Sequence, residues 1–258
     1  MSAQNTPQAP AVVIPLDFPH TLHDAVARDV ADRLQVHPVP SRPLNWRPAN
    51  APPGAKWSGT IAPNGYWDYE FIGAWQGVKY RFIACSEHDE SYTASVKRAG
   101  NSPGQPERYI QDRELFDFFV CGLSSLECFC YGLYAFASDI DRQTLPFSSD
   151  QHKRNATIRN TVKAFIKSFP QEPLTKALSQ FEQENDFRDW ERIRNVLAHR
   201  VTPGRDMYEL AGIPQQSWVE WSDGVTIDEH TTKTRRQWLA QILTELLTEA
   251  SAFTTKFK

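Results

Sequence analysis

The sequence predicts a mainly α-helical protein, and three features of its apolar pattern predict this fold class. Apolar residues recur at spacings of three and four through most of the chain after about residue 111, as on one face of an α-helix. Between residues 57 and 96 they alternate with polar residues instead, which is typical of β-strands. Two short apolar runs flank Ser222-Asp223-Gly224, a sequence typical of a hairpin turn. We therefore expect a helical bundle with a small antiparallel β module on its N-terminal side and a β-hairpin insertion before its last helix.

The chain is expected to begin with an arm, one short helix and a linker. Residues 1–19 are rich in Pro and Gln and lack the pattern of a signal peptide, so they predict an extended arm. An apolar repeat of four residues predicts a helix over residues 20–36. The prolines between residues 38 and 56 predict an extended linker, because proline cannot continue a helix.

Residues 57–96 are predicted to be the antiparallel β module. Two runs of alternating aromatic and charged residues, 67–71 and 78–82, lie on either side of Gly77, as the strands of a hairpin do. One run carries acidic residues and the other basic ones, which suits pairing across adjacent strands. We expect the aromatic face to cover a neighbouring core, since stacking on nucleic-acid bases is a less common use of such a face.

A loop rich in Gly and Pro at residues 99–107 divides the chain into two predicted domains, 1–110 and 111–258. The helices expected in the second domain cover residues 112–139 and 156–168, begin at Pro173 and near Asp186, and finish with residues 231–253. The first of them is apolar nearly all round, so we expect it at the centre of the bundle. Asp117 and Glu127 interrupt its apolar run, which favours a core helix over a membrane span.

The charge and the cysteines limit the possible classes of function. Lys and Arg number 28 against 31 Asp and Glu, so contact with nucleic acid would require a local basic patch. The 4 cysteines lack the spacing of a metal site, because Cys128 and Cys130 point to nearly opposite sides of a helix. We interpret the cysteines as buried, reduced thiols, which favours a cytoplasmic protein.

The helix that begins near Asp186 places an arginine on its packing face. The apolar face of this helix comprises Phe187, Trp190, Ile193 and Leu197. Arg194 lies toward the same face, so its guanidinium needs a carboxylate, a phosphate or water. Glu127, in the apolar central helix, is equally costly to bury without a partner. We therefore expect Arg194 and Glu127 to form an ion pair.

The adjoining face of the same helix is polar and basic. Asn195 and His199 are four residues apart and therefore stack on this face, which Arg188 and Arg192 share. Together with Arg200, these two arginines form a candidate RNA-binding surface. Taken one at a time, such arginines more often belong to a solvated face.

The hexapeptide Arg194-Asn195-Val196-Leu197-Ala198-His199, late in a helical domain and followed by one long helix, resembles the motif of the HEPN family. The resemblance covers about residues 111–258 and explains nothing in residues 1–110. It implies a HEPN-like helical bundle. For many members it also implies a metal-independent endoribonuclease without a cofactor, which acts as a homodimer with two copies of the motif at the interface.

The resemblance also implies a role for each residue of the motif. RNA is cleaved through attack by its own 2′-hydroxyl, which needs proton exchange and a cation near the phosphate. His199 can exchange protons near neutral pH, and Arg194 can bind the phosphate through two hydrogen bonds. Asn195 can orient His199 or bind a phosphate oxygen, and Glu127 can support Arg194.

The resemblance has one departure. Some members that act as toxins carry a Tyr two residues after the His, which a partner enzyme modifies. Val201 occupies this position here, so that form of regulation is not expected, although Tyr208 follows at a short distance. An antitoxin or another protein regulator is left open.

Two alternatives compete with catalysis. Arg194 and Glu127 can form a purely structural ion pair, and His199 can stabilise the end of its helix through the helix dipole. A HEPN-like module without catalytic activity can instead bind a nucleotide, RNA or a protein partner. Activity that depends on the motif would distinguish the enzyme from both.

Overall fold

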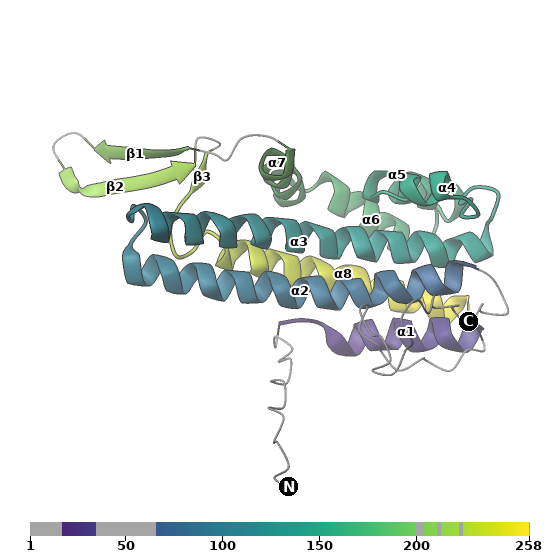
Figure 1. The fold of residues 1–258 in the computed structure, drawn as a ribbon. Coiled ribbons are helices and arrows are strands. Elements are labelled where there is room, and N and C mark those ends of the chain that lie inside the picture. The colour runs from purple at the N-terminus through teal and green to yellow at the C-terminus, as the bar shows by residue number, and fades with distance from the viewer. Residues whose placement is uncertain (1–16, 35–65, 200–203, 211–212, 222–223, 258) are drawn as a thin grey trace, which may run out of the picture.

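The computed structural model describes residues 17–34, 66–199, 204–210, 213–221 and 224–257 (Figure 1). These residues form eight helices and a small antiparallel sheet, so the predicted mainly α-helical class is confirmed. The helices are α1 (His20–Leu34), α2 (Tyr66–Ala99), α3 (Gln105–Ile140), α4 (Asp150–Asn155), α5 (Ile158–Ser168), α6 (Pro173–Gln183), α7 (Asn185–His199) and α8 (Lys233–Lys256). The strands are β1 (Arg205–Leu210), β2 (Ile213–Trp221) and β3 (Val225–Thr226).

Two long helices form the axis of the bundle. α2 and α3 lie side by side along their length, and the short connection at residues 100–104 makes them antiparallel (Figure 1). α8 packs against this pair, and α1 packs on α8. α5 and α7 lie on α3, and α6 bridges them to α8. The central position predicted for the apolar helix is therefore confirmed for α3.

The predicted β module is wrong for the residues that the structure describes, because Tyr66–Ala99 is one helix of 34 residues. Phe71, Trp75, Val78 and Phe82 recur at spacings of four, three and four, and all four are buried. This helical repeat overlaps the short alternating runs. Burial against α3 decides between the two patterns, because local β propensity depends strongly on context. Residues 57–65, the linker predicted over 38–56 and residues 1–16 of the arm predicted over 1–19 lie outside the described residues. At the described end of that arm, Phe18 is buried in the core.

Gly77 does not form the predicted turn but lies where α2 approaches α3. A Cβ atom at this position would lie 2.8 Å from the Cys128 sulfur, closer than real Cβ atoms come. The turn between the two helices is at residues 100–104, where Gly100 has a φ of 75°. α3 consequently begins at Gln105, earlier than expected, and the proposed domain border at residue 110 falls inside it. One hydrophobic core contains residues from both sides of that border, for example Phe82 and Phe119.

Most of the other expected elements are present. The helix predicted over residues 20–36 is α1, and those predicted for the second domain are α5, α6, α7 and α8. The predicted hairpin around Gly224 consists of β2 and β3, and Gly224 has a φ of 79°. Two elements were not expected from the sequence: β1, which pairs with β2, and the short helix α4, which Ser149 caps through its side chain.

The sheet is attached to the bundle by a buried arginine. Arg205 pairs with Trp221 in the register of β1 and β2. Its guanidinium donates to the Asp112 carboxylate at 2.6 Å and to the Gln111 side chain at 2.9 Å. Because only 5% of the Arg205 side chain is exposed, the base of the sheet is fixed on the first turns of α3.

α3 is the one helix in the described part of the chain that is long and apolar enough to cross a membrane by length and composition. Its most apolar window is 67% buried inside the bundle, as in the core helix of a soluble protein. The interpretation of this segment as a core helix is therefore confirmed, and the fold is compatible with a soluble protein.

Candidate functional site

Helix α7, which carries the motif, is seated on α3 by its apolar face. Phe187, Trp190 and Ile193 are buried, as the sequence predicts, and Leu197 packs partly buried against the core. The Trp190 ring occupies the space above Gly122 of α3, where a Cβ atom would lie 2.2 Å from the ring. The absence of a side chain at Gly122 therefore sets the close approach of the two helices.

The predicted ion pair between Arg194 and Glu127 is confirmed. The Arg194 Nη2 atom donates to Glu127 Oε1 at 2.5 Å, and it joins α7 to α3. The Arg194 side chain is 23% exposed and that of Glu127 is 43% exposed, so solvent reaches the pair. Ser124 also donates a hydrogen bond to the second oxygen of Glu127, at 3.3 Å. The guanidinium is thus held from one side at the surface of the bundle.

The remaining residues of the motif follow along α7. Asn195 is exposed, next to Arg194. His199 is the last residue of α7, so its backbone lies one helical turn beyond Asn195 on the same face. The side chain of His199 and the whole of Arg200 lie outside the described residues. The structure therefore brings Arg194 and Glu127 together and exposes Asn195, while the convergence of Arg194 and His199 stays a prediction.

The basic face of α7 is partly balanced by acidic residues. Arg188 and Arg192 are both exposed, as expected. Arg192 pairs with Asp189 at 2.7 Å, and Arg235 of α8 pairs with the same carboxylate at 3.1 Å. Burial opposes ionisation of the Asp189 carboxyl, but the hydrogen bonds from the two arginines lower its pKa below the usual value. The local excess of positive charge is therefore smaller than the sequence suggests.

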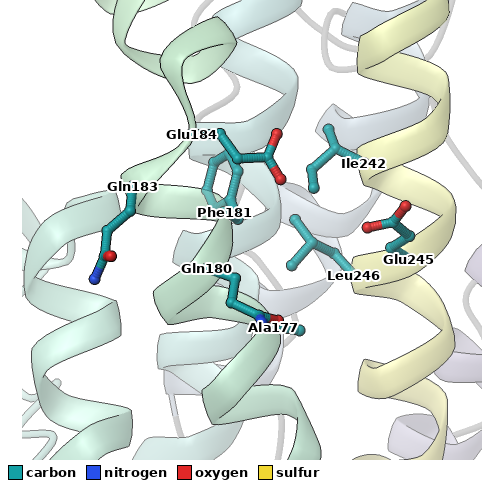
Figure 2. A pocket seen from close by; sticks show the side chains of 8 residues that line it. All are labelled: Ala177, Gln180, Phe181, Gln183, Glu184, Ile242, Glu245 and Leu246. Atoms are coloured by element: carbon teal, nitrogen blue, oxygen red, sulfur yellow. The ribbon is translucent and has the colours of Figure 1, made fainter.

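A surface pocket of about 380 Å³ lies between α6 and α8 and contains no residue of the motif. Its lining residues are Ala177, Gln180, Phe181, Gln183, Glu184, Ile242, Glu245 and Leu246 (Figure 2). Two carboxylates and two amides surround an apolar wall, and Glu184 accepts a hydrogen bond from the Trp238 indole at 2.8 Å. Because the carboxylates repel phosphate, this pocket is unsuited to RNA.

A cluster that the sequence analysis did not anticipate joins α2 to α3. His88 Nδ1 donates to Glu114 Oε2 at 2.7 Å. An interaction with the Cys121 side chain raises the pKa of His88 to about 9. Burial opposes this rise, while the bond with Glu114 and the charge of Asp117 support it. The sequence alone does not predict a role for His88, because its partner Glu114 lies on another helix.

This cluster predicts a dependence of stability on pH. The folded-state pKa of His88 lies above the value of about 6.5 in an unfolded chain, so its protonation stabilises the fold fully below pH ~6.5. The contribution is lost as the pH rises through about 9. In urea unfolding, the stability difference between the parent and His88→Gln should shrink across this range. Replacement of the exposed His230 by Gln is the control, and a difference for His88→Gln that does not vary with pH would contradict the expectation.

The described residues contain no group of three or more His, Cys, Asp or Glu side chains placed to hold a metal ion. The interpretation of the cysteines as buried holds for Cys85 and Cys130, whereas Cys121 and Cys128 are only partly buried. All four are free thiols. Comparison of the chain with protein-family models, with curated proteins and with solved structures finds no match.

Proposed function

We propose that the protein is a metal-independent endoribonuclease of the HEPN type. The observation that carries the proposal is the solvent-accessible ion pair of Arg194 with Glu127, on a helix that exposes Asn195 and ends at His199. The Nε atom of Arg194 is buried without a hydrogen-bond partner, so the groups that this partly exposed side chain can present to a phosphate are those of its outer nitrogens, which the carboxylate holds in a defined direction. This preorganisation is what stabilisation of a developing phosphate charge requires.

The chemistry assigns a separate task to each side chain. Attack by the 2′-hydroxyl of RNA on the adjacent phosphate expels the 5′-oxygen of the next nucleotide. His199 transfers a proton from the attacking 2′-hydroxyl toward the departing 5′-oxygen, a task that suits an imidazole near neutral pH. Arg194 binds the phosphate and stabilises the extra negative charge, while Glu127 positions Arg194. Asn195 orients His199 or binds a phosphate oxygen. The reaction needs no metal ion and no cofactor.

The proposed enzyme acts on RNA as a homodimer in the cytoplasm. Two motifs meet at the interface, and Arg188, Arg192 and Arg200 hold the RNA backbone near it. Asp189 already shares the charge of Arg192, so we expect RNA affinity to be modest and to fall with salt. An antitoxin-like protein regulator is compatible with this arrangement.

The test is incubation of the purified full-length chain with RNA in EDTA. The expected result is RNA cleavage with products that end in a 2′,3′-cyclic phosphate, together with a dimer in size-exclusion chromatography coupled to light scattering. RNA binding without any cleavage would favour the alternative, a HEPN-like module that binds nucleotide, RNA or protein. If the protein neither binds nor cleaves any RNA in a broad panel, the proposal is refuted.

Glu127 is expected to contribute less to the rate than Arg194 itself. Glu127→Gln keeps a hydrogen-bond acceptor but removes the charge, so cleavage should fall about tenfold, which corresponds to about 1.4 kcal/mol. The loss should appear in kcat, since a loosely held guanidinium weakens binding of the transition state more than binding of RNA. Replacement of the exposed Glu245 by Gln is the matched control and should not change the rate. Cleavage by Glu127→Gln at the parental rate would exclude a positioning role.

A further inference from the structure

The segment that contains α4 and α5 is strongly basic, although the chain as a whole is slightly acidic. Residues 151–171 contain five Lys and Arg and no Asp or Glu, whereas the whole chain has 28 Lys and Arg against 31 Asp and Glu. The five are Lys153, Arg154, Arg159, Lys163 and Lys167. Such a local concentration of positive charge is what contact with nucleic acid requires in a protein that is not basic overall.

Helix α5 arranges three of these cations in a row. Its apolar residues, for example Val162 and Phe165, face the core. Arg159, Lys163 and Lys167 are exposed and recur every four residues, so they lie along one side of the helix over about 12 Å. We call this row of three residues the α5 stripe. No ion pair joins the ammonium group of Lys163 or Lys167 to another of the described residues, so both groups are available to a ligand.

One end of the α5 stripe lies beside the motif on α7. Arg159 pairs with Glu191 of α7, with 2.5 Å between the two charged groups. Glu191 precedes Arg194 by three residues, so the two are neighbours on the surface of α7. α5 and α7 also share α3 as the helix on which both lie. The stripe therefore begins about one helical turn from the arginine of the motif.

The other end of the α5 stripe lies well away from the motif. Ser168, next to Lys167, donates to the Asp141 carboxylate at 2.7 Å, and Asp141 is the residue that ends α3. Glu127, the partner of Arg194, lies near the middle of α3, about 20 Å from Asp141 along the helix axis. The three cations therefore extend from the motif toward the C-terminal end of α3.

The exposed side of α5 suits a nucleic-acid backbone better than an anionic membrane. A helix that lies on a membrane needs a broad apolar face that is directed outward. The apolar face of α5 is directed into the core, and Ile166, with 49% exposed, is its one exposed large hydrophobic residue. Lysine ammonium groups bind phosphates as point charges and require no particular base sequence.

We propose that the α5 stripe binds the phosphate backbone of a single strand of RNA on one side of the bond that is cleaved. A single row of cations matches one strand, because one strand presents one row of phosphates. The inference deepens the proposed function and rests on it for the identity of the ligand. The substrate is accordingly an RNA with an unpaired stretch of several nucleotides beside the cleaved bond.

The α5 stripe contributes to binding and not to the chemical step. Contacts to the phosphate backbone position an RNA but carry no sequence information. Lys163 and Lys167 contribute more than Arg159, which shares its charge with Glu191. Their removal should therefore raise KM for a long RNA and leave kcat unchanged, because the contacts are the same before and during the reaction.

The test measures binding apart from cleavage. Fluorescence anisotropy follows the full chain on a single-stranded RNA in which every 2′-hydroxyl is methylated, so that it cannot be cleaved. Each phosphate contact contributes about 0.7 to the slope of log affinity against log salt concentration for a single strand. Lys163→Gln/Lys167→Gln should therefore lower the slope by about 1.4 and weaken binding at least about tenfold at about 0.1 M salt.

Two matched variants separate the α5 stripe from net charge. Lys97→Gln/Lys233→Gln removes the same charge from two exposed lysines outside the basic segment and should bind RNA as the parent does. Lys163→Arg/Lys167→Arg keeps both positive charges and should retain most of the affinity. Circular dichroism confirms that each variant is folded, as expected for substitutions of exposed side chains.

The outcomes distinguish this inference from the proposed enzyme. Unchanged affinity and salt dependence in Lys163→Gln/Lys167→Gln would overturn the α5 stripe even if the parent cleaves RNA. An equal loss in Lys97→Gln/Lys233→Gln would overturn it too, and so would binding to phosphatidylserine vesicles without binding to RNA. A parent that binds the methylated RNA through the two lysines but cleaves no RNA would support the stripe and contradict the enzyme.

Discussion

Replacement of either Arg194 or His199 by Ala is expected to reduce RNA cleavage in EDTA by about 100-fold to 10,000-fold. Loss of a general acid–base group, or of a donor that stabilises the developing charge, has effects of about this size. The two residues act on one phosphate, so the double variant should be little slower than the slower single variant. Arg194→Lys should also be strongly impaired, since an ammonium keeps the charge but not the two-pronged geometry.

A matched control separates this effect from a general loss of positive charge. Arg142 lies just beyond the C-terminal end of α3, is 75% exposed and pairs with Asp139. Arg142→Ala should cleave RNA at the parental rate. The comparison is made with single-turnover rates on one RNA, for variants whose unfolding temperatures match that of the parent. Cleavage that persists in folded Arg194→Ala and His199→Ala would show that the motif is not the active site.

Gly122→Ala is expected to lower the free energy of unfolding by about 2 kcal/mol, because overpacking a close helix contact costs about 1–3 kcal/mol. The added Cβ would lie 2.2 Å from the buried Trp190 ring, which is rigid and packed against Phe118 and Phe119. The corresponding fall in Tm is about 4–8 °C. Thermal or urea unfolding followed by circular dichroism measures the change.

Two further variants test the cause of this loss. Gly73→Ala, on α2, is the control, because nothing lies within 4 Å of a Cβ there and alanine favours a helix over glycine. It should leave stability unchanged or raise it slightly. Trp190→Phe removes the ring atoms that clash, so the Gly122→Ala/Trp190→Phe variant should lose less stability than the sum of the two single losses. If the two losses of stability simply add, contact with the Trp190 ring is not the cause of the loss in Gly122→Ala.

The ion pair between Arg194 and Glu127 shows what the sequence could predict about the site. The two residues are 67 positions apart, but each lies among apolar residues in the sequence, which predicts that each has a partner of opposite charge. The pairing is confirmed, whereas the expected burial of Glu127 is not, because 43% of its side chain is exposed. The helices after residue 111 were predictable for a related reason, because long amphipathic repeats and Pro breaks are strong local signals.

The helical state of residues 66–99 and the contact of His88 with α3 could not be predicted in this way. In α2 the alternating runs and the repeat of Phe71, Trp75, Val78 and Phe82 coexist, and only packing against α3 decides between them. With α2 interpreted as strands, no helical register connects His88 to Glu114. The sequence does contain a signal, namely an acidic residue in an otherwise apolar helix, but it does not identify the partner.

The packing of α1 on α8 has a consequence for how the chain is made. On the ribosome, α1 emerges before every other described helix and α8 emerges after them. The buried side chains of α1, such as Val26 and Val30, therefore lack their final neighbours until α8 has been synthesised. Contacts between distant parts of a sequence slow folding and prolong the exposure of apolar surface. Nascent chains stalled before α8 should consequently aggregate more readily, and need chaperones more, than chains that have completed α8.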